Sequence, residues 1–279
     1  LEEADHRFSV AGRLIRNRGA ILLIQDGSGA IQLYLNRDTL SEEAVQAIKT
    51  WDLGDIVGAS GPLHRSGKGD LYINMERGRL LTKALRPLPD KYHGLVDQQM
   101  RYRQRYVDLI VNPEAREVFR IRAATVQCIR QFLVSRQFVE VETPMLHPIA
   151  GGATARPFIT HHNTLDIPLY LRIATELHLK RMVVGGFEKV YELGRIFRNE
   201  GISTKHNPEF TSVEIYQAFC NYIDMMDLTE ELIKDTISDA CSSLVVNYQN
   251  KEIDFSKPWL RISMKDIVKE YTGIDFNSF

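Results

Sequence analysis

Short apolar segments separated by turn residues fill the first third of the chain. Five of them have the length and patterning of half-buried strands, at residues 8–15, 21–25, 31–35, 56–59 and 71–74. Between the third and fourth segments, Ser41 is a suitable N-cap, and Val45, Ile48 and Trp51 recur three positions apart. The pattern predicts a small β domain over residues 1–85 with one helix at 41–51.

Five short strands with a helix between the third and the fourth are the element order of an OB-fold barrel. Many such barrels bind single-stranded nucleic acid through base stacking and backbone charge. Gln32 is a candidate reader of a base edge, and Arg13, Arg16, Arg18 and Arg37 give the domain basic character. Small barrels also bind many other ligands, and scattered arginines are mostly solvated, so the pattern alone leaves nucleic-acid binding open.

Residues 86–112 have the composition of a linker followed by a connecting helix. Pro87 and Pro89 interrupt regular structure, and residues 98–110 have helical spacing. Arginines and tyrosines are interleaved along this helix, at positions 101–106. Such a helix can contact an RNA backbone, and it is equally well explained as a solvated connector.

Longer helices and strands follow, which predicts a second domain over residues 113–279 and an α+β fold for the chain. Asn112 and Pro113 favour a helix start, and residues 138–144 alternate as a strand that ends in Pro144. Thr175 is expected to cap a helix at 176–184. Another helix is expected at 227–240 and a strand at 170–173, while residues 246–255 and 259–262 have the pattern of strands or loops.

The densest chemistry lies in two alternating segments, 189–197 and 209–216, which predict antiparallel strands joined by a polar loop at 199–208. Alternation places Phe210, Ser212, Glu214 and Tyr216 on one face of the second strand. Arg198 follows the first strand. An arginine fork matches phosphate, an aromatic ring stacks on a purine, and a carboxylate with a phenol holds an ammonium group. The residues alone favour a nucleotide site and an ordinary structural hairpin about equally.

Composition narrows the class of protein. The chain has 279 residues, 44% hydrophobic and 25% charged, with a net charge of −1, so nucleic-acid binding must depend on local basic patches. Cys128, Cys220 and Cys241 have no metal-like spacing and suggest a reducing, cytoplasmic setting. The pair His161 and His162 lacks a third ligand at suitable spacing. There is no apolar run long enough for a membrane span, and residues 1–5 lack a signal-peptide pattern.

The sequence Phe-Arg-Asn-Glu-Gly-Ile-Ser at 197–203, followed by His-Asn-Pro-Glu-Phe-Thr at 206–211, resembles motif 2 of class II aminoacyl-tRNA synthetases. The spacing resembles the lysyl-tRNA synthetase family in particular. The long helix, the strand and Pro144 resemble motif 1, the element through which class II enzymes form homodimers. The resemblance implies an anticodon-binding OB-fold domain and an antiparallel-sheet catalytic domain.

The same resemblance assigns roles to individual residues. ATP would be bound by Arg198, Glu200, His206, Asn207 and Phe210, and L-lysine by Gly152, Glu176, Arg198, Glu214 and Tyr216. Arg198 would be the catalytic residue, holding the α-phosphate while the lysine carboxylate attacks it. Arg18 and Gln32 would contact the anticodon of tRNA(Lys). The implied reaction is ATP-dependent charging of tRNA(Lys) through a lysyl-adenylate, with Mg²⁺.

This chain departs from the family pattern at several places. Ile21 stands where an anticodon-stacking aromatic is expected, and Gln137 where the family usually has glycine. Motif 3 and the carboxylates that hold magnesium do not occur before Phe279. We therefore expect an incomplete chain of a longer enzyme, without its metal ligands and inactive by itself.

Three other functions remain open. A paralogue that lysylates elongation factor P lacks an OB-fold domain, so residues 1–85 argue against it. Aspartyl- and asparaginyl-tRNA synthetases share the architecture, but residues 151–158 and the pair Glu214 and Tyr216 favour lysine. A non-catalytic RNA-binding module, in which the hairpin is only structural, is distinguished by testing whether lysine and ATP bind at Arg198 and Phe210.

Overall fold

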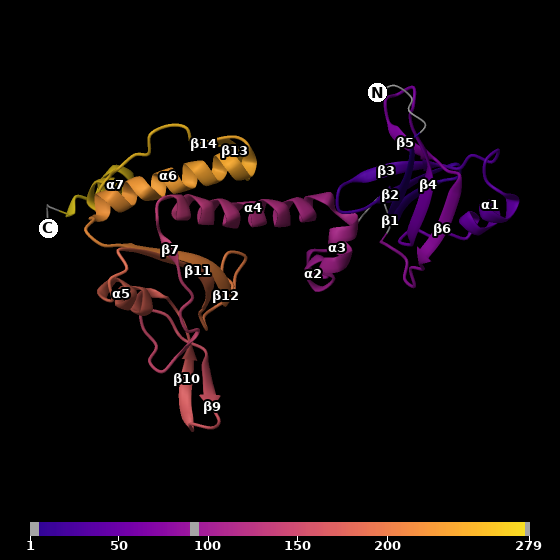
Figure 1. Cartoon of the computed structure of the whole chain (residues 1–279). Helices are drawn as coiled ribbons and strands as arrows, with labels where there is room; N and C mark the ends of the chain where they lie inside the picture. Colours follow the sequence, from indigo (N-terminus) through magenta and orange to yellow (C-terminus); the bar gives the residue numbers. More distant parts are fainter. Residues whose placement is uncertain (1–5, 90–94, 277–279) are drawn as a thin grey trace. The chain divides into compact units, whose positions relative to one another are not determined.

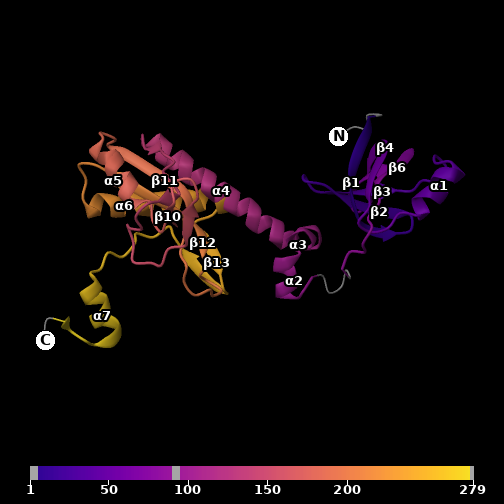
Figure 2. The same ribbon diagram turned by 90° about the horizontal axis from the view of Figure 1, so that it is seen from below.

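The computed structural model describes residues 6–89 and 95–276, in two compact units that divide at Arg116 and Glu117 (Figures 1 and 2). The sequence predictions for residues 1–5, and for the part of the linker at 90–94, lie outside the described residues. No helix among the described residues has the length and apolarity needed to cross a membrane.

The first unit is a β-barrel. Its elements are β1 (Arg7–Arg18), β2 (Ile21–Gln25), β3 (Ala30–Tyr34), α1 (Glu42–Lys49), β4 (Ile56–Arg65), β5 (Leu71–Asn74) and β6 (Arg77–Thr82). The strand order is β1-β2-β3-β5-β4-β6, and the long β1 also pairs with β4, which closes the sheet. Leu14, Leu33, Val57 and Ile73 are fully buried inside it. The five predicted strands and the helix are confirmed.

Strand β6 was missed by the sequence analysis. It pairs antiparallel with β4, but its Leu80 and Leu81 are neighbours and both are exposed, so the segment lacks the alternation of a half-buried strand. The chain passes close to β4 where β5 ends. A Cβ on Gly61 would lie 1.9 Å from the carbonyl oxygen of Asn74, so glycine is required at that crossing.

Two short helices replace the single helix predicted at 98–110: α2 (Gln98–Arg103) and α3 (Arg105–Val111). The chain leaves helical geometry at Gln104, with φ −117° and ψ 54°. The fully buried carboxylate of Asp108 accepts hydrogen bonds from Arg101 Nε at 2.8 Å, from Asn112 Nδ2 at 2.6 Å and from Arg105. Burial alone would raise the pKa of Asp108, but these bonds outweigh it and hold the pKa below its ordinary value.

The long helix α4 (Pro113–Ser135) starts at the predicted residue and leads into the second unit. Of the strand predicted at 138–144, only β7 (Val139–Glu140) forms, and it pairs parallel with β11 (Lys189–Phe197). The rest is extended and bound to the sheet by single contacts, such as Val141 N to Tyr191 O at 3.0 Å. Gln137, between helix and strand, has φ +68°, a conformation that suits glycine better.

The central sheet of the second unit has the order β12-β11-β7, with β12 at Glu209–Gln217. Helices α4 and α6 (Tyr222–Cys241) lie side by side over one face (Figure 1). Phe132, Leu133 and Leu232 from these helices pack there against Tyr191, with Val213 and Ile215 from β12. The opposite face is approached by the start of α5 (Glu176–Val184).

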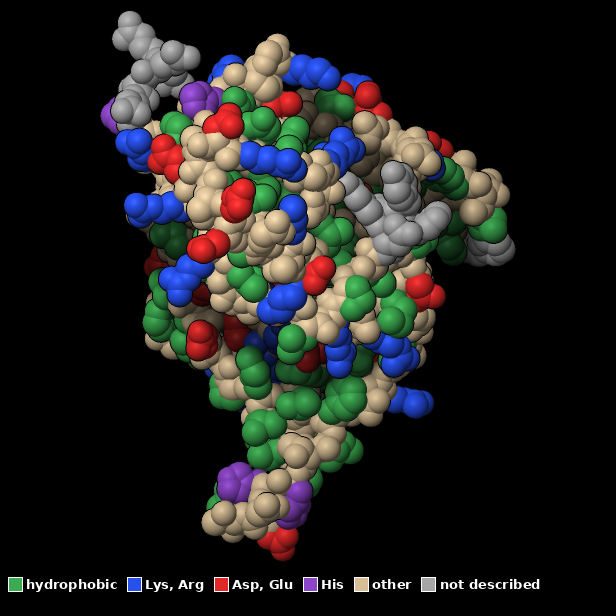
Figure 3. Space-filling model, turned by 90° about the vertical axis from the view of Figure 1, so that its right-hand side faces the viewer, with side chains coloured by type: hydrophobic (Ala, Val, Ile, Leu, Met, Phe, Trp, Pro, Cys, Tyr) green, Lys and Arg blue, Asp and Glu red, His purple; other side chains and the backbone are tan. Residues whose placement is uncertain are grey.

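A second small sheet, β8-β10-β9, forms an arm that projects from this unit (Figure 1). Its strands are β8 (Leu146–His147), β9 (Ile159–His162) and β10 (Ile167–Leu171). Of the strand expected at 170–173, residues 170 and 171 are the end of β10 and the other two lie outside it, and β9 was not predicted. Figure 3 shows histidines at the projecting tip. Nε2 of His161 lies 3.1 Å from Asp166 Oδ1, and both side chains are exposed.

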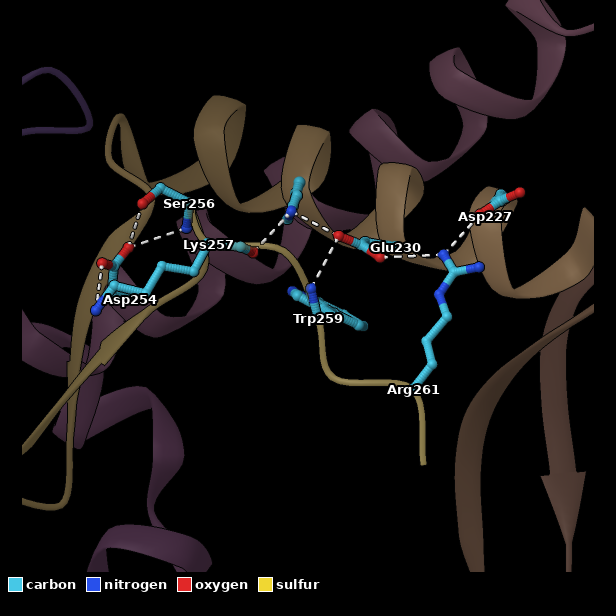
Figure 4. A network of polar contacts seen from close by, with 8 residues as sticks. Asp227, Glu230, Asp254, Ser256, Lys257, Trp259 and Arg261 are labelled. Atoms are coloured by element: carbon cyan, nitrogen blue, oxygen red, sulfur yellow. Dashed lines mark hydrogen bonds and ion pairs between the residues drawn. The ribbon is translucent and has the colours of Figure 1, made fainter. Parts of the chain in front are cut away.

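Helix α6 begins five residues before the predicted start, because Asn221 and Asp224 form a capping box. It is followed by β13 (Val245–Tyr248), β14 (Lys251–Asp254) and α7 (Met264–Thr272), a helix that was not predicted. Figure 4 shows how α6 holds the segment after β14. Glu230 accepts from Lys234 at 2.7 Å and from Trp259 N at 3.3 Å, and Arg261 bridges Asp227 and Glu230.

Candidate active site and candidate nucleic-acid interface

The predicted hairpin is confirmed. Strands β11 and β12 pair in antiparallel register, with Glu192 opposite Glu214 and Ile196 opposite Phe210. Because paired residues share a face, these four side chains lie on the side of the sheet away from α4 and α6. The candidate ligand residues of β12 therefore lie on the face of the sheet that the start of α5 approaches. The residues of β12 that pack against α4 and α6 lie on the opposite face.

Glu214 is held at the centre of this face. Its Oε1 accepts from the backbone N–H of Thr175 at 2.9 Å, and its Oε2 accepts from the Tyr216 hydroxyl at 3.3 Å. Burial raises the pKa of Tyr216, and the negative charges of Glu214 and Glu176 raise it further, so the phenol stays protonated and remains a donor. The result is a half-buried carboxylate with a fixed orientation.

The expected cap of α5 by the side chain of Thr175 is wrong. Thr175 has helical φ and ψ of −99° and −4°, and its buried Oγ1 has no hydrogen-bond partner among the described residues. Glu214 instead accepts the backbone N–H at this helix start. A carboxylate at a helix N-terminus is favoured by the helix dipole, and this interaction joins β12 to α5.

Gly152 and Glu176 lie together at the same helix start. A Cβ on Gly152 would lie 3.2 Å from the Cβ of Glu176 and 3.2 Å from that of Ala174, and Gly152 has φ +88°, so glycine allows the close approach. Glu176 Oε1 accepts from Lys180 Nζ at 2.5 Å, one helical turn along. Its charge also acts on Tyr216. Gly152, Glu176, Glu214 and Tyr216 are thus brought together.

Arg198 lies at the other end of the hairpin. Its guanidinium carbon is 5.4 Å from the centre of the Phe210 ring, close enough for a cation–π interaction. Its Nε is buried and has no hydrogen-bond partner among the described residues. A buried, unsatisfied donor of a cation favours an anionic ligand, because leaving it unpaired costs free energy.

The loop between the strands holds the remaining predicted ATP residues. Glu200 Oε1 accepts from Arg156 N at 3.3 Å, and Arg156 O accepts from Asn199 N at 2.8 Å, so the loop after Gly152 is joined to the hairpin. His206 Nδ1 lies 2.8 Å from Ser203 Oγ. Glu200, His206 and Asn207 are exposed, and the hydrogen bonds of Glu200 and His206 are to Arg156 and Ser203, not to Arg198.

Sequence reasoning missed Arg172 and Arg156. The first is a fully buried arginine between β10 and α5, and the second contributes only its backbone. The signal for Arg172 is its place in the apolar run Tyr-Leu-Arg-Ile-Ala at 170–174. A charged residue inside such a run indicates a buried ion pair. For Arg156 the sequence carries no such signal.

No group of three or more His, Cys, Asp or Glu among residues 6–89 and 95–276 has the geometry of a metal site. The cysteines at 128, 220 and 241 are free. The described side chains therefore do not offer a site that fits a magnesium ion by themselves.

A second candidate site lies on the barrel of the first unit. Ile21, Gln32, Leu33, Tyr34, Ser66 and Tyr72 line a pocket of about 220 Å³. The ring of Tyr72 is stacked on His64 at 5.7 Å and meets Tyr34 edge-on at 6.0 Å. Aromatic faces beside an amide suit a nucleobase, since stacking tolerates any base and the amide reads its edge.

Of the two predicted nucleic-acid contacts, Gln32 lies in this pocket, whereas Arg18 is at the exposed end of β1, paired with Ile21. Tyr34, His64 and Tyr72 were missed, although aromatic residues on adjoining strands are a recognisable signal. On the face in Figure 3, Lys and Arg side chains are interspersed with Asp and Glu.

Two family models match the chain. Residues 97–278 match tRNA synthetases class II (D, K and N), and residues 8–81 match the OB-fold nucleic acid binding domain. These matches confirm the fold class expected from the sequence: an OB-fold barrel and part of a class II catalytic domain.

Curated relatives agree with the lysyl resemblance. A lysine–tRNA ligase of Prochlorococcus marinus (strain MIT 9312) is 64% identical over 292 residues, covering 100% of this chain and 57% of the relative. One from Chromohalobacter salexigens is 57% identical over 271 residues, covering 97% of this chain and 54% of the relative. The chain thus spans a little over half the length of these relatives. It belongs to the class II tRNA synthetases of the D, K and N group, in which the relatives named above are lysine–tRNA ligases.

Proposed function

We propose that the protein activates L-lysine with ATP and transfers the lysyl group to tRNA(Lys), with the hairpin β11–β12 as the substrate face. The observation that carries the proposal is the pairing of two unlike ends on one face. A fixed carboxylate, Glu214, lies at one end, and an unsatisfied arginine beside an aromatic ring, Arg198 with Phe210, lies at the other. Lysine and ATP offer an ammonium group and phosphates to these ends.

In the proposed first step, the α-carboxylate of lysine attacks the α-phosphorus of ATP. A phosphorus–oxygen bond to lysine forms, the bond to the β-phosphate breaks, and pyrophosphate leaves. Arg198 stabilises the negative charge on the α-phosphate and the attacking carboxylate, while Phe210 stacks on adenine. Glu200, His206 and Asn207 in the loop contribute contacts to ATP. In the second step the tRNA 3′ hydroxyl takes the lysyl group and AMP leaves.

Glu214 and Tyr216 hold the side-chain ammonium of lysine, and Glu176 with Gly152 forms the boundary for its α-amino group. A carboxylate is needed because an ammonium group out of water is costly without a counter-charge. The α-amino group of the ligand would replace Lys180 as the partner of Glu176 Oε1. Lys180 is exposed, so its ion pair with Glu176 contributes little to stability. Magnesium would neutralise phosphate charge when bound, and no step above depends on it.

The barrel of the first unit binds the anticodon of tRNA(Lys) in this proposal, with Gln32 in the aromatic pocket and Arg18 near the RNA backbone.

Homodimerisation through the segment around Pro144 is also proposed. It is supported by the exposure of Val139, Met145 and Leu146 in that segment, since exposed apolar residues favour a protein contact. Free cysteines are compatible with the cytoplasm.

The test is ATP–pyrophosphate exchange with the full-length gene product, comparing lysine with aspartate and asparagine. We expect exchange with lysine only. Arg198→Ala should abolish it, because the α-phosphate loses its cation, whereas Arg195→Gln, which alters an exposed ion pair on the opposite face of β11, should leave it unchanged. Wild-type exchange by Arg198→Ala would refute the assigned role.

A further inference from the structure

Arg172 is the largest fully buried side chain in the part of the chain that the structure describes. Its Nη1 donates to Glu192 Oε1 and, at 3.2 Å, to the carbonyl of Thr143. The hydroxyl of Thr143 donates in turn to the second oxygen of Glu192 at 2.6 Å. Arg172 and Glu192 are only 1% and 4% exposed, so this is a buried ion pair, supported by further hydrogen bonds to both partners.

Arg172 also binds the backbone of β11 at two places. Its Nε donates to the carbonyl of Arg195 at 2.8 Å, and its own carbonyl accepts from Phe197 N at 3.0 Å. Just before these points the guanidinium lies against Gly194, where a Cβ would come within 2.5 Å of Nη2. Arg172 therefore holds the strand at Arg195 and at Phe197, immediately before Arg198, the residue proposed to hold phosphate.

The ion pair also decides which carboxylate is available on the substrate face. Glu192 lies directly opposite Glu214 across the two strands, and like charges in this arrangement repel. Arg172 and Thr143 satisfy Glu192 with a cation and a hydroxyl donor. Glu214 accepts from a backbone N–H and a neutral phenol, and among the described residues it forms no ion pair with a cation.

We propose that Arg172 is a positioning residue for the substrate face. It holds β11 so that Arg198 meets the phosphate, and it neutralises Glu192 so that Glu214 is the carboxylate that receives the lysine ammonium. Arg172 itself touches neither substrate. The inference depends on the proposed function.

The two parts of this role are separable by steady-state exchange kinetics in the full-length gene product. Arg172→Leu leaves Glu192 without a counter-charge and removes the bond to the backbone of β11, so we expect kcat about 10-fold lower and the lysine KM about 10-fold higher. The double variant Arg172→Leu with Glu192→Leu removes the competing carboxylate and the buried charge. Its Tm and lysine KM should return towards wild type, while kcat stays about 10-fold low because the hold on β11 is still missing.

A conservative variant also separates the two roles of Arg172, the hold on β11 and the neutralisation of Glu192. Arg172→Lys keeps a cation for Glu192 but loses the planar fork that reaches Arg195 and Glu192 together. It should therefore have a nearly normal lysine KM and a lowered kcat. Lys83→Met is the matched control, since it removes the cation beside another buried carboxylate, Asp55, in the first unit. It should lower stability without lowering kcat of exchange.

A double variant with wild-type kcat would overturn the inference, because Arg172 would then matter only for stability. A lysine KM unchanged in Arg172→Leu would overturn the part concerning Glu214. If the wild-type protein showed no lysine-dependent exchange, the proposed function itself would fail and this inference with it, a result distinct from both of the others.

Discussion

Thr175 takes part in the candidate site through its backbone N–H, which orients Glu214, and its side chain is left without a partner among the described residues. Sequence reasoning assigned Thr175 a capping role because its hydroxyl is suited to it. The carboxylate of Glu214, on strand β12, accepts the N–H at the helix start instead. The type of residue at position 175 cannot reveal such a tertiary contact. Glu214 itself was predictable, because strand alternation placed it beside Phe210 and Tyr216.

Glu214→Gln should lower kcat/KM for lysine about 100-fold, since a charge-assisted hydrogen bond to the ammonium contributes about 3 kcal/mol and the amide keeps only the shape. The KM for ATP should change little. Lysine-dependent pyrophosphate exchange at varied lysine and at varied ATP measures both quantities.

Glu209→Gln is the control for that substitution. It alters a carboxylate on the same strand that faces the other way and forms an exposed ion pair with Arg195. Its kinetics should match wild type. Equal losses for lysine and ATP in Glu214→Gln would contradict the assignment of Glu214 to the amino-acid pocket.

At the scale of elements, the hairpin β11–β12 was predictable because two alternating segments flank a polar loop. The joint between α2 and α3 was not. Helical spacing continues through Gln104, and the break reflects a buried carboxylate, Asp108, that draws Arg101 and Arg105 to itself. The same contacts engage two arginines that the sequence had offered as RNA contacts. Strand β6 was hidden for a different reason, since edge pairing needs no buried alternation.

Asp108→Asn should destabilise the first unit by about 2–3 kcal/mol, because two arginines lose their buried counter-charge. Denaturant unfolding measures this loss. The pKa of Asp108 is lowered by folding, so its contribution is present above the ordinary carboxyl pKa and is lost as pH falls through the lowered value. The difference between wild type and variant should therefore shrink in acid.

Asp97→Asn provides a matched control on the same pair of helices. Asp97 caps α2 through Met100 N, and asparagine caps equally well, so stability should be unchanged. An equal loss in both variants would show that the joint does not depend on the Asp108 ion pairs.

The core beneath the hairpin has a pH dependence of its own. Burial raises the pKa of Tyr191 to about 12, with help from its hydrogen bond to Glu140 at 2.9 Å and from the charge of that residue. A raised pKa means that the stabilisation is complete below the unfolded value, near 10, and is lost as pH rises towards 12. We expect the second unit to lose about 2 kcal/mol over this range.

Tyr191→Phe should lack that alkaline loss, although it starts from a lower stability because the bond to Glu140 is gone. Urea unfolding at pH 8, 10 and 11 compares the two proteins. Tyr248→Phe, at an exposed tyrosine of the same unit, should follow wild type. Parallel curves for wild type and Tyr191→Phe would refute the role of this phenol.

At the scale of the whole molecule, the chain divides its chemistry between two units. The barrel offers a pocket with aromatic walls, and the second unit offers the hairpin face. The order of strands predicted the barrel, but the pocket required the structure, because Tyr34, His64 and Tyr72 come from three strands that only folding brings together. Ile21, where an aromatic was expected, lines the same pocket.

Tyr72→Ala should raise the KM for tRNA in the charging reaction by about 10-fold, since stacking on a base contributes about 1–3 kcal/mol. Lysine-dependent pyrophosphate exchange, which needs no tRNA, should be unchanged. Phe8→Ala, at another exposed aromatic of the barrel, is the control and should leave both activities intact. Loss of exchange in Tyr72→Ala would indicate damage to the fold in place of an effect on tRNA.

Gln137 connects the last turn of α4 to β7 in a left-handed conformation, at a strain cost of about 1 kcal/mol for a residue with a side chain. Glycine would avoid that strain but would make the unfolded chain more flexible, and the two effects oppose each other. Neighbouring Leu133 and Phe138 are buried and hold the geometry whichever residue stands there. Gln137→Gly should therefore change the stability of the second unit by less than about 1 kcal/mol.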